Sequence, residues 1–387
     1  MSSFIPLSIP YLGGNEGKHI KTCIDTGWVS SAGKFVNRFE SAIRAYTRTQ
    51  HAIACVNGTA ALHISLLLAG VQPGEEVIVP TLTFIAPVNA VRYLGADPIF
   101  MDCDRYYNLD IEKTIHFLQR ETRSKRGKVY NKSTGRRIAA VIPVHVFGNA
   151  VSLEPLLPIC REMNIKIVED ATESLGTFYR TGRLSGKHTG SVGHIGCLSF
   201  NGNKIITTGG GGMILTDDLQ LAERARYLTM QAKDDEVRFI HDEIGYNYRL
   251  TNIQAALGVA QLQQLPRFRK IKLRNYVTYK NEIDRLPGYH IAEVPPEADN
   301  NHWMYALQID DEKTGKGRDV ILALFNANKI QTRPVWYLNH WQKPYLSSMA
   351  YRIENAPRLW AKTLNIPCSV SLTDEQIRKV VRVLANT

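Results

Sequence analysis

The sequence has few of the features that mark disulfide-bonded, redox or metal proteins. Its 387 residues include only six cysteines, at positions 23, 55, 103, 160, 197 and 368, and none stands in a Cys-x-x-Cys or other paired spacing. The eleven histidines form no His-Glu-x-x-His motif and no cluster with carboxylates. We therefore expect reduced thiols, a cytoplasmic location and no metal site.

Long apolar runs are also missing. The apolar stretches at 64–70 and 138–144 are far shorter than the ~20 residues that a membrane helix needs. The N-terminal segment lacks the basic region and long apolar region of a secretory signal. The 28 glycines and 17 prolines are spread along the chain, which excludes collagen-like and low-complexity character. With 44% hydrophobic residues, the chain is expected to form a large globular core.

Charge is unevenly distributed. Lysine and arginine exceed aspartate and glutamate by 47 to 36, and residues 120–137 carry eight basic side chains against one acidic. This polar run with glycine and serine predicts an exposed hairpin or loop. The excess suits either nucleic acid or an acidic small substrate such as a sugar nucleotide. A non-enzymatic regulator or nucleic-acid binder is therefore an alternative, but no helix-turn-helix, RNP or zinc-finger signature supports it.

The first two thirds of the chain alternate between apolar strand patterns and helical patterns. We expect strands at 75–80, 97–102, 138–145, 165–170, 197–200 and 212–216. Helices are expected at 59–69, 156–164, 219–229 and 252–264. Near-continuous apolar strands separated by helices predict an α/β fold with a mostly parallel sheet covered on both faces.

The last third predicts a second, smaller domain. A charged helix is expected to begin at Pro266 and to run to about residue 286, bridging the two domains. Strands at 302–309 and 330–336, a helix at 318–328 and a final helix after Thr373 follow. We therefore divide the chain into a large domain, 1–265, and a small C-terminal α+β domain, 266–387, on which the N-terminal segment can pack.

Lys204 stands in the most informative segment, SFNGNKIITTGGGGM, where it precedes the four glycines Gly209–Gly212. The glycines allow the backbone to approach another group closely. Neither a P-loop nor a G-x-G-x-x-G fingerprint is present, so the segment matches no standard phosphate loop. A lone lysine is usually a solvated surface charge, and its assignment depends on two further features.

Those features are a strand-end aspartate and a helix N-terminus. Asp170 ends an apolar strand, where open α/β sheets bind ligands. The helix that begins at about Thr59 offers free N–H groups and the positive end of its dipole to an anion. Each alone could be an ordinary turn or cap. Together with Lys204, 34 residues after Asp170, they are typical of a pyridoxal-phosphate (PLP) enzyme.

Eight motifs in order resemble the DegT/DnrJ/EryC1/StrS family of sugar aminotransferases. They are TGWVSSAGKFVNRFE (26–40), NGTAAL (57–62), PTLTFIAPVNA (80–90), VHVFGN (144–149), EDATESLG (169–176), SFNGNKIITTGGGG (199–212), GYNYRLTNIQAALG (245–258) and TRPVW (332–336). The resemblance implies the type I PLP-dependent transferase (aspartate aminotransferase) fold, with a large domain built on a mostly parallel sheet and a smaller C-terminal α+β domain. It also implies pyridoxal 5′-phosphate as the cofactor.

The resemblance assigns roles to individual residues. Lys204 would bind PLP covalently and then move protons, and Asp170 would bond the pyridine nitrogen. Glu173 would bond the ring hydroxyl, and Phe84 would stack on the ring. The cofactor phosphate would be held by the backbone N–H groups of Thr59 and Ala60, the Ser199 hydroxyl and, from the neighbouring subunit, Asn247.

Substrate contacts are assigned less directly. The resemblance points to Trp28, Ser30, Arg333 and His340, although core packing for Trp28 and a surface ion pair for Arg333 are equally compatible with the sequence. His145 follows a buried strand, and we interpret it as structural.

The expected reaction is transfer of an amino group from L-glutamate to C4 of a UDP-linked 4-keto-6-deoxy-N-acetylglucosamine. Within the family the chain resembles the enzymes of the bacillosamine and legionaminic acid routes to bacterial surface glycans such as lipopolysaccharide O-antigen. Glu173, where many relatives carry Gln or His, and the basic insertion at 120–137 carry this interpretation. The partners expected are the nucleotide sugar, glutamate and a second copy of the chain that shares the active sites, without nucleic acid or membrane.

Two alternatives and two departures qualify this interpretation. The substrate could be a GDP-linked or another 4-keto or 3-keto deoxysugar nucleotide. A PLP-dependent sugar dehydratase is the other alternative, but such relatives have histidine in place of the lysine, and Lys204 argues against it. Asn57 stands where serine is common, and Thr207–Gly210 lacks a glutamate that many relatives have between glycines.

Overall fold

A central sheet of eight strands forms the large domain. The structure, a computed structural model, describes residues 4–235 and 237–386. Along the sheet the strands are β1 (His51–Cys55), β10 (Gly212–Thr216), β9 (Ile195–Ser199), β7 (Lys166–Asp170), β6 (Ile138–Val141), β2 (Glu76–Pro80), β3 (Asp97–Met101) and β15 (Ala350–Tyr351). Neighbours from β9 to β15 are parallel, and only the pairings of β10 are antiparallel. The expected α/β fold with a mostly parallel sheet is therefore confirmed.

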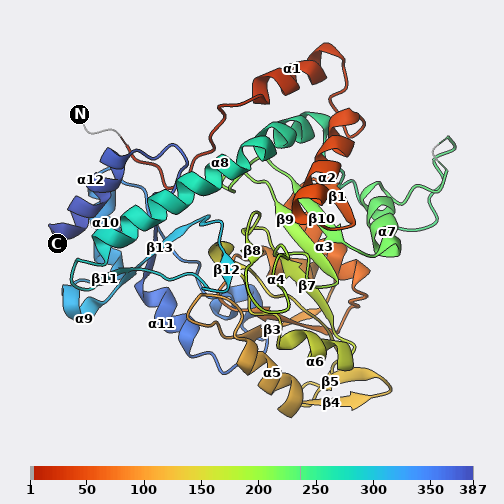
Figure 1. The fold of residues 1–387 in the computed structure, drawn as a ribbon. Coiled ribbons are helices and arrows are strands. Elements are labelled where there is room, and N and C mark those ends of the chain that lie inside the picture. The colour runs from red at the N-terminus through yellow and green to blue at the C-terminus, as the bar shows by residue number, and fades with distance from the viewer. Residues whose placement is uncertain (1–3, 236, 387) are drawn as a thin grey trace.

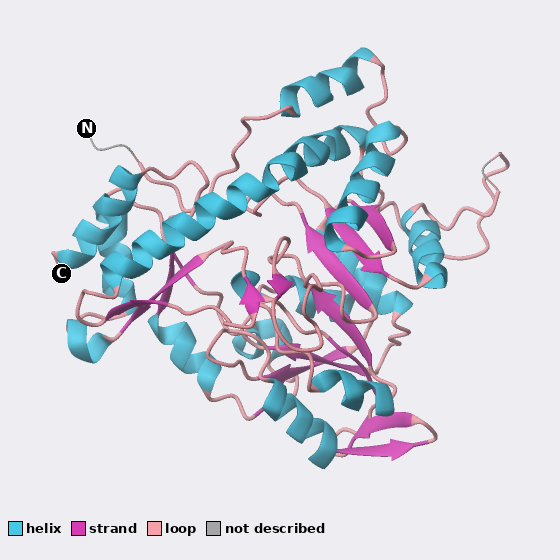
Figure 2. Ribbon diagram, in the orientation of Figure 1, coloured by secondary structure: helices cyan, strands magenta, loops and turns pink. Residues whose placement is uncertain are grey.

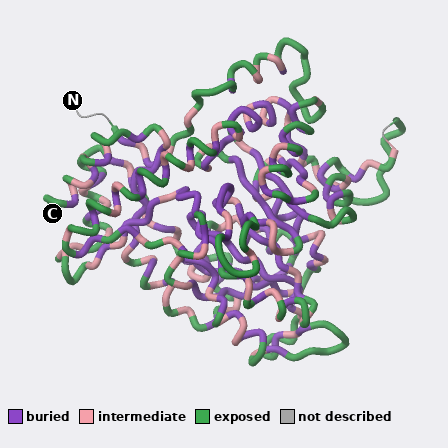
Figure 3. Tube along the Cα trace, viewed as in Figure 1, coloured by how far each residue is buried: buried purple, intermediate pink, exposed green. Residues whose placement is uncertain are grey.

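Helices cover both faces of this sheet (Figures 1 and 2). Within β2, Val77 and Val79 join the core cluster that contains α3 (Gly58–Leu68) and α4 (Ala86–Tyr93), whereas Ile78 joins the cluster of α5 (Ile111–Arg120) and α6 (Leu156–Glu162). Alternate side chains of a strand point to opposite faces, so both faces must be apolar. Figure 3 shows the resulting buried centre of the domain.

The N-terminal helices and α7 complete the large domain. They are α1 (Glu16–Asp25), α2 (Lys34–Thr47) and α7 (Leu219–Thr229). Beyond α7 the chain extends as an exposed arm before it returns to α8 (Figure 1). Short elements lie in the connections, namely β8 (Phe178–Tyr179), which pairs with β12 (Ala298–Asp299), and the 3₁₀ turns Val146–Gly148, Asn339–Trp341 and Lys343–Tyr345.

One continuous helix replaces the two helices expected on either side of Pro266. Helix α8 runs from Asn252 to Ile283 and has Pro266 inside it. A proline removes one helical hydrogen bond, but residues on both sides of it, such as Val259 and Phe268, are buried. We attribute the uninterrupted helix to this packing, so the expectation of a helix start at Pro266 is wrong. The domain boundary at 265 falls inside α8.

The small domain is an antiparallel sheet packed against helices. Its strands run in the order β11 (Tyr289–Ile291), β13 (Tyr305–Ile309), β16 (Thr363–Ile366) and β14 (Arg333–Pro334). Its helices are α9 (Asp311–Thr314), α10 (Arg318–Ala327), α11 (Asn355–Lys362) and α12 (Asp374–Ala385). Thr373 and Gln376 form the capping box expected from their spacing. Ile5 pairs with Ile330 in the small domain, and β15 pairs with β3 in the large sheet, so one segment from each side of residue 265 packs on the other domain.

The basic segment forms a hairpin that projects from the large domain. Strands β4 (Thr122–Lys125) and β5 (Lys128–Asn131) pair in register, and the side chains at 123–128 are exposed. This is the surface hairpin predicted from its composition. In the described ranges, no helix is long and apolar enough to cross a membrane.

Candidate active site

Lys204 opens onto a cavity of about 500 Å³ where the carboxyl ends of β7 and β9 meet the N-terminus of α3. Six of the residues predicted from the sequence line it together: Thr59, Phe84, Glu173, Ser199, Lys204 and Arg333. This is the edge of an open α/β sheet at which ligands bind. The topology therefore brings together residues that lie up to 274 positions apart (59 to 333).

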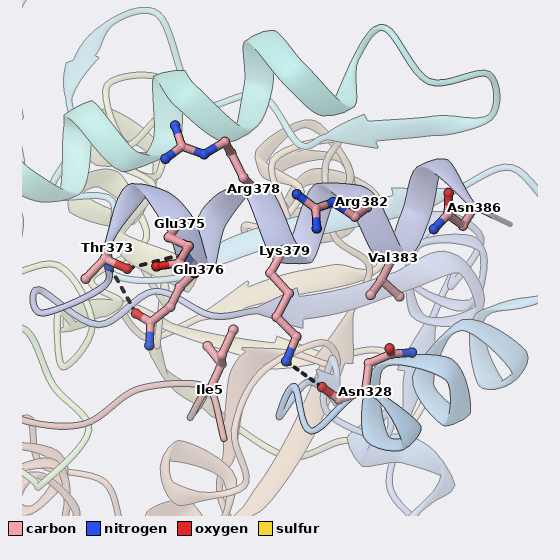
Figure 4. Close-up of a pocket in the computed structure, with 10 residues that line it drawn as sticks. All are labelled: Ile5, Asn328, Thr373, Glu375, Gln376, Arg378, Lys379, Arg382, Val383 and Asn386. Atoms are coloured by element: carbon pink, nitrogen blue, oxygen red, sulfur yellow. Dashed lines mark hydrogen bonds between the residues drawn. The ribbon is translucent and has the colours of Figure 1, made fainter. Parts of the chain in front are cut away.

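A second cavity, of about 610 Å³, lies on the small domain along α12 (Figure 4). Its walls include Ile5 and Asn328, and the Lys379 amine donates to the Asn328 carbonyl at 2.9 Å. None of the residues predicted for chemistry lines it. Because chemistry depends on reactive groups rather than on size, we assign the active site to the cavity of Lys204.

The Lys204 amine lies between a carboxylate and an indole. Its Nζ is 3.8 Å from Glu173 Oε1 and 4.2 Å from the centroid of the Trp303 ring, and its side chain is 13% exposed. Burial lowers the pKa of Lys204, while Glu173 and Asp170 act in the opposite direction. A lysine with a lowered pKa holds more neutral amine near pH 7, which suits a nucleophile and proton carrier.

Asp170 is a buried carboxylate behind the cavity wall. Only 2% of the residue is exposed, and its Oδ1 accepts from the Thr172 N–H at 3.1 Å. Burial raises its pKa, whereas Thr172, Lys204 and His145 lower it. A buried carboxylate is stable in its charged form only with a strong donor, so a protonated ring nitrogen is a suitable partner.

Glu173 is held in place by a strained neighbour. Its Oε2 accepts from the Phe147 N–H at 2.8 Å, and Phe147 has a left-handed backbone, with φ of 58°. Such a conformation costs free energy in a bulky residue and is concentrated at functional sites. Burial raises the pKa of Glu173 to about 7.

We expect Glu173→Gln to stabilise the cofactor-free protein at pH 8 but not at pH 4. With a pKa raised from 4.5 to about 7, the folded state binds more protons than the unfolded state between those values. Stability therefore falls as pH rises through this window, by on the order of 3 kcal/mol for the wild type. Glutamine removes this titration. Melting curves of both proteins at pH 4 and pH 8 test this. If the variant differed from the wild type in melting temperature by the same amount at both pH values, the prediction would be contradicted.

The N-terminus of α3 meets the end of β9 at close range. A Cβ at Gly58 would lie 2.9 Å from Ser199 Cβ, and one at Gly212 would overlap the backbone of Asn57 and Gly58. Gly212 therefore lets β10 pass beside the start of α3, which explains part of the glycine run. The first turn of α3 has no acidic side chain, so its positive end faces the cavity uncompensated.

Ala60 and Asn247 do not line the Lys204 cavity. The Ala60 N–H donates to Asn57 Oδ1 at 2.7 Å. The side chain of Asn57, which stands where serine is common in the family, therefore occupies the Ala60 amide that was predicted to bind the cofactor phosphate. Asn247 is exposed next to the arm that follows α7. Its assignment to a neighbouring subunit's phosphate stays a prediction, as does that of Ala60.

Three of the four predicted substrate residues also lie outside this cavity. Trp28 is 59% exposed beside a separate pocket, and the Ser30 carbonyl accepts from the Asn252 N–H at 2.6 Å. His340 Nδ1 bonds the Thr81 hydroxyl at 2.6 Å. Within one chain only Arg333 reaches the cavity, and the roles of the other three stay predictions.

His145 is engaged at both ring nitrogens. Its Nε2 lies 2.9 Å from Glu169 Oε2, and its Nδ1 accepts from the Val151 N–H at 3.0 Å. The ring is fully buried. These contacts agree with the structural interpretation.

Two tryptophans in the cavity wall were not predicted. Trp303 packs under Lys204, and Trp336 lies 6.5 Å from the exposed Phe84 ring, centroid to centroid. Trp336 belongs to the quoted TRPVW motif, which was a usable signal. Trp303 comes from the turn before β13, and no local pattern distinguished it from core packing.

The donor set fits a phosphorylated pyridine aldehyde. The cavity offers an amine with a lowered pKa, a buried carboxylate in need of a cationic partner, and a helix N-terminus for an anion. These groups sit on three different elements, and all of them are at one end of the sheet.

Comparison with known proteins agrees with this fit. The model of the DegT/DnrJ/EryC1/StrS aminotransferase family matches residues 10–385. The chain is 37% identical to a GDP-perosamine synthase of Caulobacter vibrioides, with 98% of this chain and 97% of that protein covered. It is 35% identical to a GDP-perosamine synthase of Escherichia coli O157:H7, with 97% and 96% covered. The solved structure of DesI with its TDP-sugar product superposes with a TM-score of 0.87, 27% identity and coverage of 100% and 93%.

Proposed function

The chain belongs to the DegT/DnrJ/EryC1/StrS aminotransferase family and is a PLP-dependent sugar aminotransferase; from this premise we propose that it aminates C4 of a GDP-linked 4-keto-6-deoxy sugar, with L-glutamate as the donor. The observation that carries the chemistry is the Lys204 amine between Glu173 and Trp303 above a cavity of about 500 Å³.

The nucleotide is inferred from the relatives. Two relatives that cover nearly the whole chain at 37% and 35% identity are GDP-perosamine synthases. They favour the GDP-linked alternative over the UDP-linked N-acetylglucosamine substrate expected from the sequence. The bacillosamine and legionaminic acid assignment is therefore replaced.

The chain's own groups divide the work of amino transfer. When bound, PLP supplies an aldehyde that exchanges amines and a ring that withdraws electrons. Lys204 would hold the cofactor through its amine, and the free amine would take a proton from the donor carbon and give it back during amination of the sugar. Asp170 keeps the ring nitrogen protonated through a charge-assisted hydrogen bond. Glu173, fixed by Phe147, orients the ring hydroxyl.

Different residues of the cavity wall are suited to the cofactor phosphate and to the sugar nucleotide. The N-terminus of α3 with Ser199 holds the cofactor phosphate. Arg333 and Trp336 also line the cavity, and a cation and an aromatic face suit a sugar diphosphate, whereas Phe84, beside Trp336, is the residue predicted to stack on the cofactor ring. The positive net charge of +11 favours the same dianionic substrate. We further propose a homodimer in which Asn247 serves the neighbouring site.

A substrate screen tests the proposed function. GDP-, UDP- and TDP-linked 4-keto-6-deoxy sugars and the free sugar are each incubated with glutamate, and products are identified by mass. We expect kcat/KM to be highest for the GDP sugar, by at least about tenfold over UDP, which corresponds to about 1.4 kcal/mol of base recognition. The free sugar should be poor because remote binding energy supports the chemical step. Preference for a UDP sugar would refute the GDP assignment while leaving the transaminase intact.

A further inference from the structure

The Trp303 ring lies against the Lys204 amine. The residue is 3% exposed, and the amine lies 4.2 Å from the centroid of its ring. The Trp303 indole N–H donates to the Asn203 carbonyl at 2.7 Å. One side chain therefore contacts the reactive amine and also ties down the residue before it.

The indole is fixed from its backbone as well. The Trp303 N–H donates to Asn301 Oδ1 at 2.9 Å, and its carbonyl accepts from the Lys272 amine at 2.8 Å. The Asn301 side-chain amide donates to the Glu173 carbonyl at 2.9 Å. The ring therefore cannot shift without disturbing the Lys204 and Glu173 turns together.

Glu173 and Asp170 favour the ammonium of Lys204, but neither makes a close hydrogen bond to it. Glu173 Oε1 is 3.8 Å from the amine, beyond hydrogen-bond distance, and Glu173 Oε2 is already bonded to Phe147. Asp170 acts on Lys204 only through its charge, and the other charged side chain in the cavity wall is the cationic Arg333. The electron-rich face of an indole attracts an ammonium and not a neutral amine.

We propose that Trp303 is a positioning residue that holds Lys204 on its ring face when that amine is protonated and not bonded to the cofactor, and so keeps the transferable proton in the site. The role of this proton rests on the proposed function. The contact between ammonium and indole does not, and it can be measured in the cofactor-free chain.

The test is the pH dependence of Lys204 acetylation in the full-length, cofactor-free protein. Acetic anhydride reacts only with the neutral amine, and peptide mass spectrometry reports its extent at Lys204 against pH. In Trp303→Leu the midpoint should fall by roughly one pH unit, the shift expected for loss of a partly buried cation–π contact. Trp303→Phe keeps a ring face and should restore most of the shift.

Trp360→Leu is the matched control. Trp360 also packs under a cation, with the Arg318 guanidinium 4.6 Å from its ring centroid, but it does not line the Lys204 cavity. Its loss should leave the Lys204 midpoint unchanged. A higher acetylation plateau in Trp303→Leu without a shifted midpoint would mean that the ring only shields the amine, and it would overturn the proposal, as would a raised midpoint.

Fluorinated tryptophan tests the same point without a change of shape. Fluorine withdraws electrons from the ring face. Protein expressed with mono-, di- and trifluorinated tryptophan should therefore show a stepwise fall in the midpoint of Lys204 acetylation. The same series in a Trp303→Phe background should be flat. This arm remains decisive if Trp303→Leu does not fold. In the loaded enzyme, the pH profile of kcat should shift in the same direction, with KM for the nucleotide sugar unchanged.

Discussion

The Lys204→Ala protein is expected to bind PLP and to lose amino transfer by roughly 10³-fold or more, because both the attaching amine and the proton carrier are removed. Its fold should persist. Burial of the charged amine costs free energy, as its lowered pKa shows. Removal of its alkyl chain only enlarges a cavity that is already open to solvent. Product formation from the best nucleotide sugar, measured by mass, and a melting curve check both parts.

Lys187→Ala is the control for this substitution. Lys187 is an exposed lysine outside the cavity, so its removal should leave turnover at the wild-type level. Full activity in Lys204→Ala would exclude the assignment of this residue. Loss of activity in both Lys204→Ala and Lys187→Ala would instead indicate that activity responds to any loss of positive charge.

Asp170→Asn is expected to lower kcat for the half-reaction with glutamate by roughly 10²-fold while the melting temperature is maintained or rises. The amide has a similar shape but no charge, so it no longer favours a protonated ring nitrogen, a bond of roughly 1.5–3 kcal/mol. In the cofactor-free protein the same change removes a carboxylate whose pKa is raised by burial. Stability at neutral pH should therefore not fall.

Asp104→Asn serves as the matched control for Asp170. Asp104 is also an aspartate beyond the end of a sheet strand, β3, and burial raises its pKa to about 7. It bonds the backbone of its own loop, at Tyr106 and Asn108, rather than the cavity. The half-reaction should be unaffected by this change. An unchanged kcat in Asp170→Asn would refute the electron-withdrawing role.

The sheet and the position of Lys204 beside its strand ends could be predicted from sequence because each rests on local pattern. The apolar runs at 76–80 and 166–170 are strands in the structure, and the strand-end Asp170 and the glycines after Lys204 are short-range signals. The strand at 51–55 was not predicted, although it pairs with β10 at the sheet edge. Its sequence, HAIAC, has two alanines and one β-branched residue, so its β-propensity is too weak to mark it as a strand.

The remaining differences come from tertiary packing. Pro266 looks like a helix start in sequence, but packing along both halves of α8 carries the helix through it. Trp303 reaches Lys204 only because the 300–303 turn is tied to the Glu173 turn through Asn301. A contact between loops this far apart in sequence leaves no pattern of hydrophobic residues from which it could be predicted. Trp28, Ser30 and Asn247 lie outside the cavity within one chain, and the role predicted for Asn247 depends on a second copy.

Reduction with borohydride followed by peptide mapping shows which lysine carries the cofactor. A protein purified with PLP should be yellow, and borohydride should bleach it while fixing the cofactor to its amine. The peptide containing Lys204 should gain the mass of the reduced cofactor, and the corresponding peptide of Lys204→Ala should gain none. An adduct on another lysine, or bleaching with no covalent adduct, would contradict the assignment of Lys204.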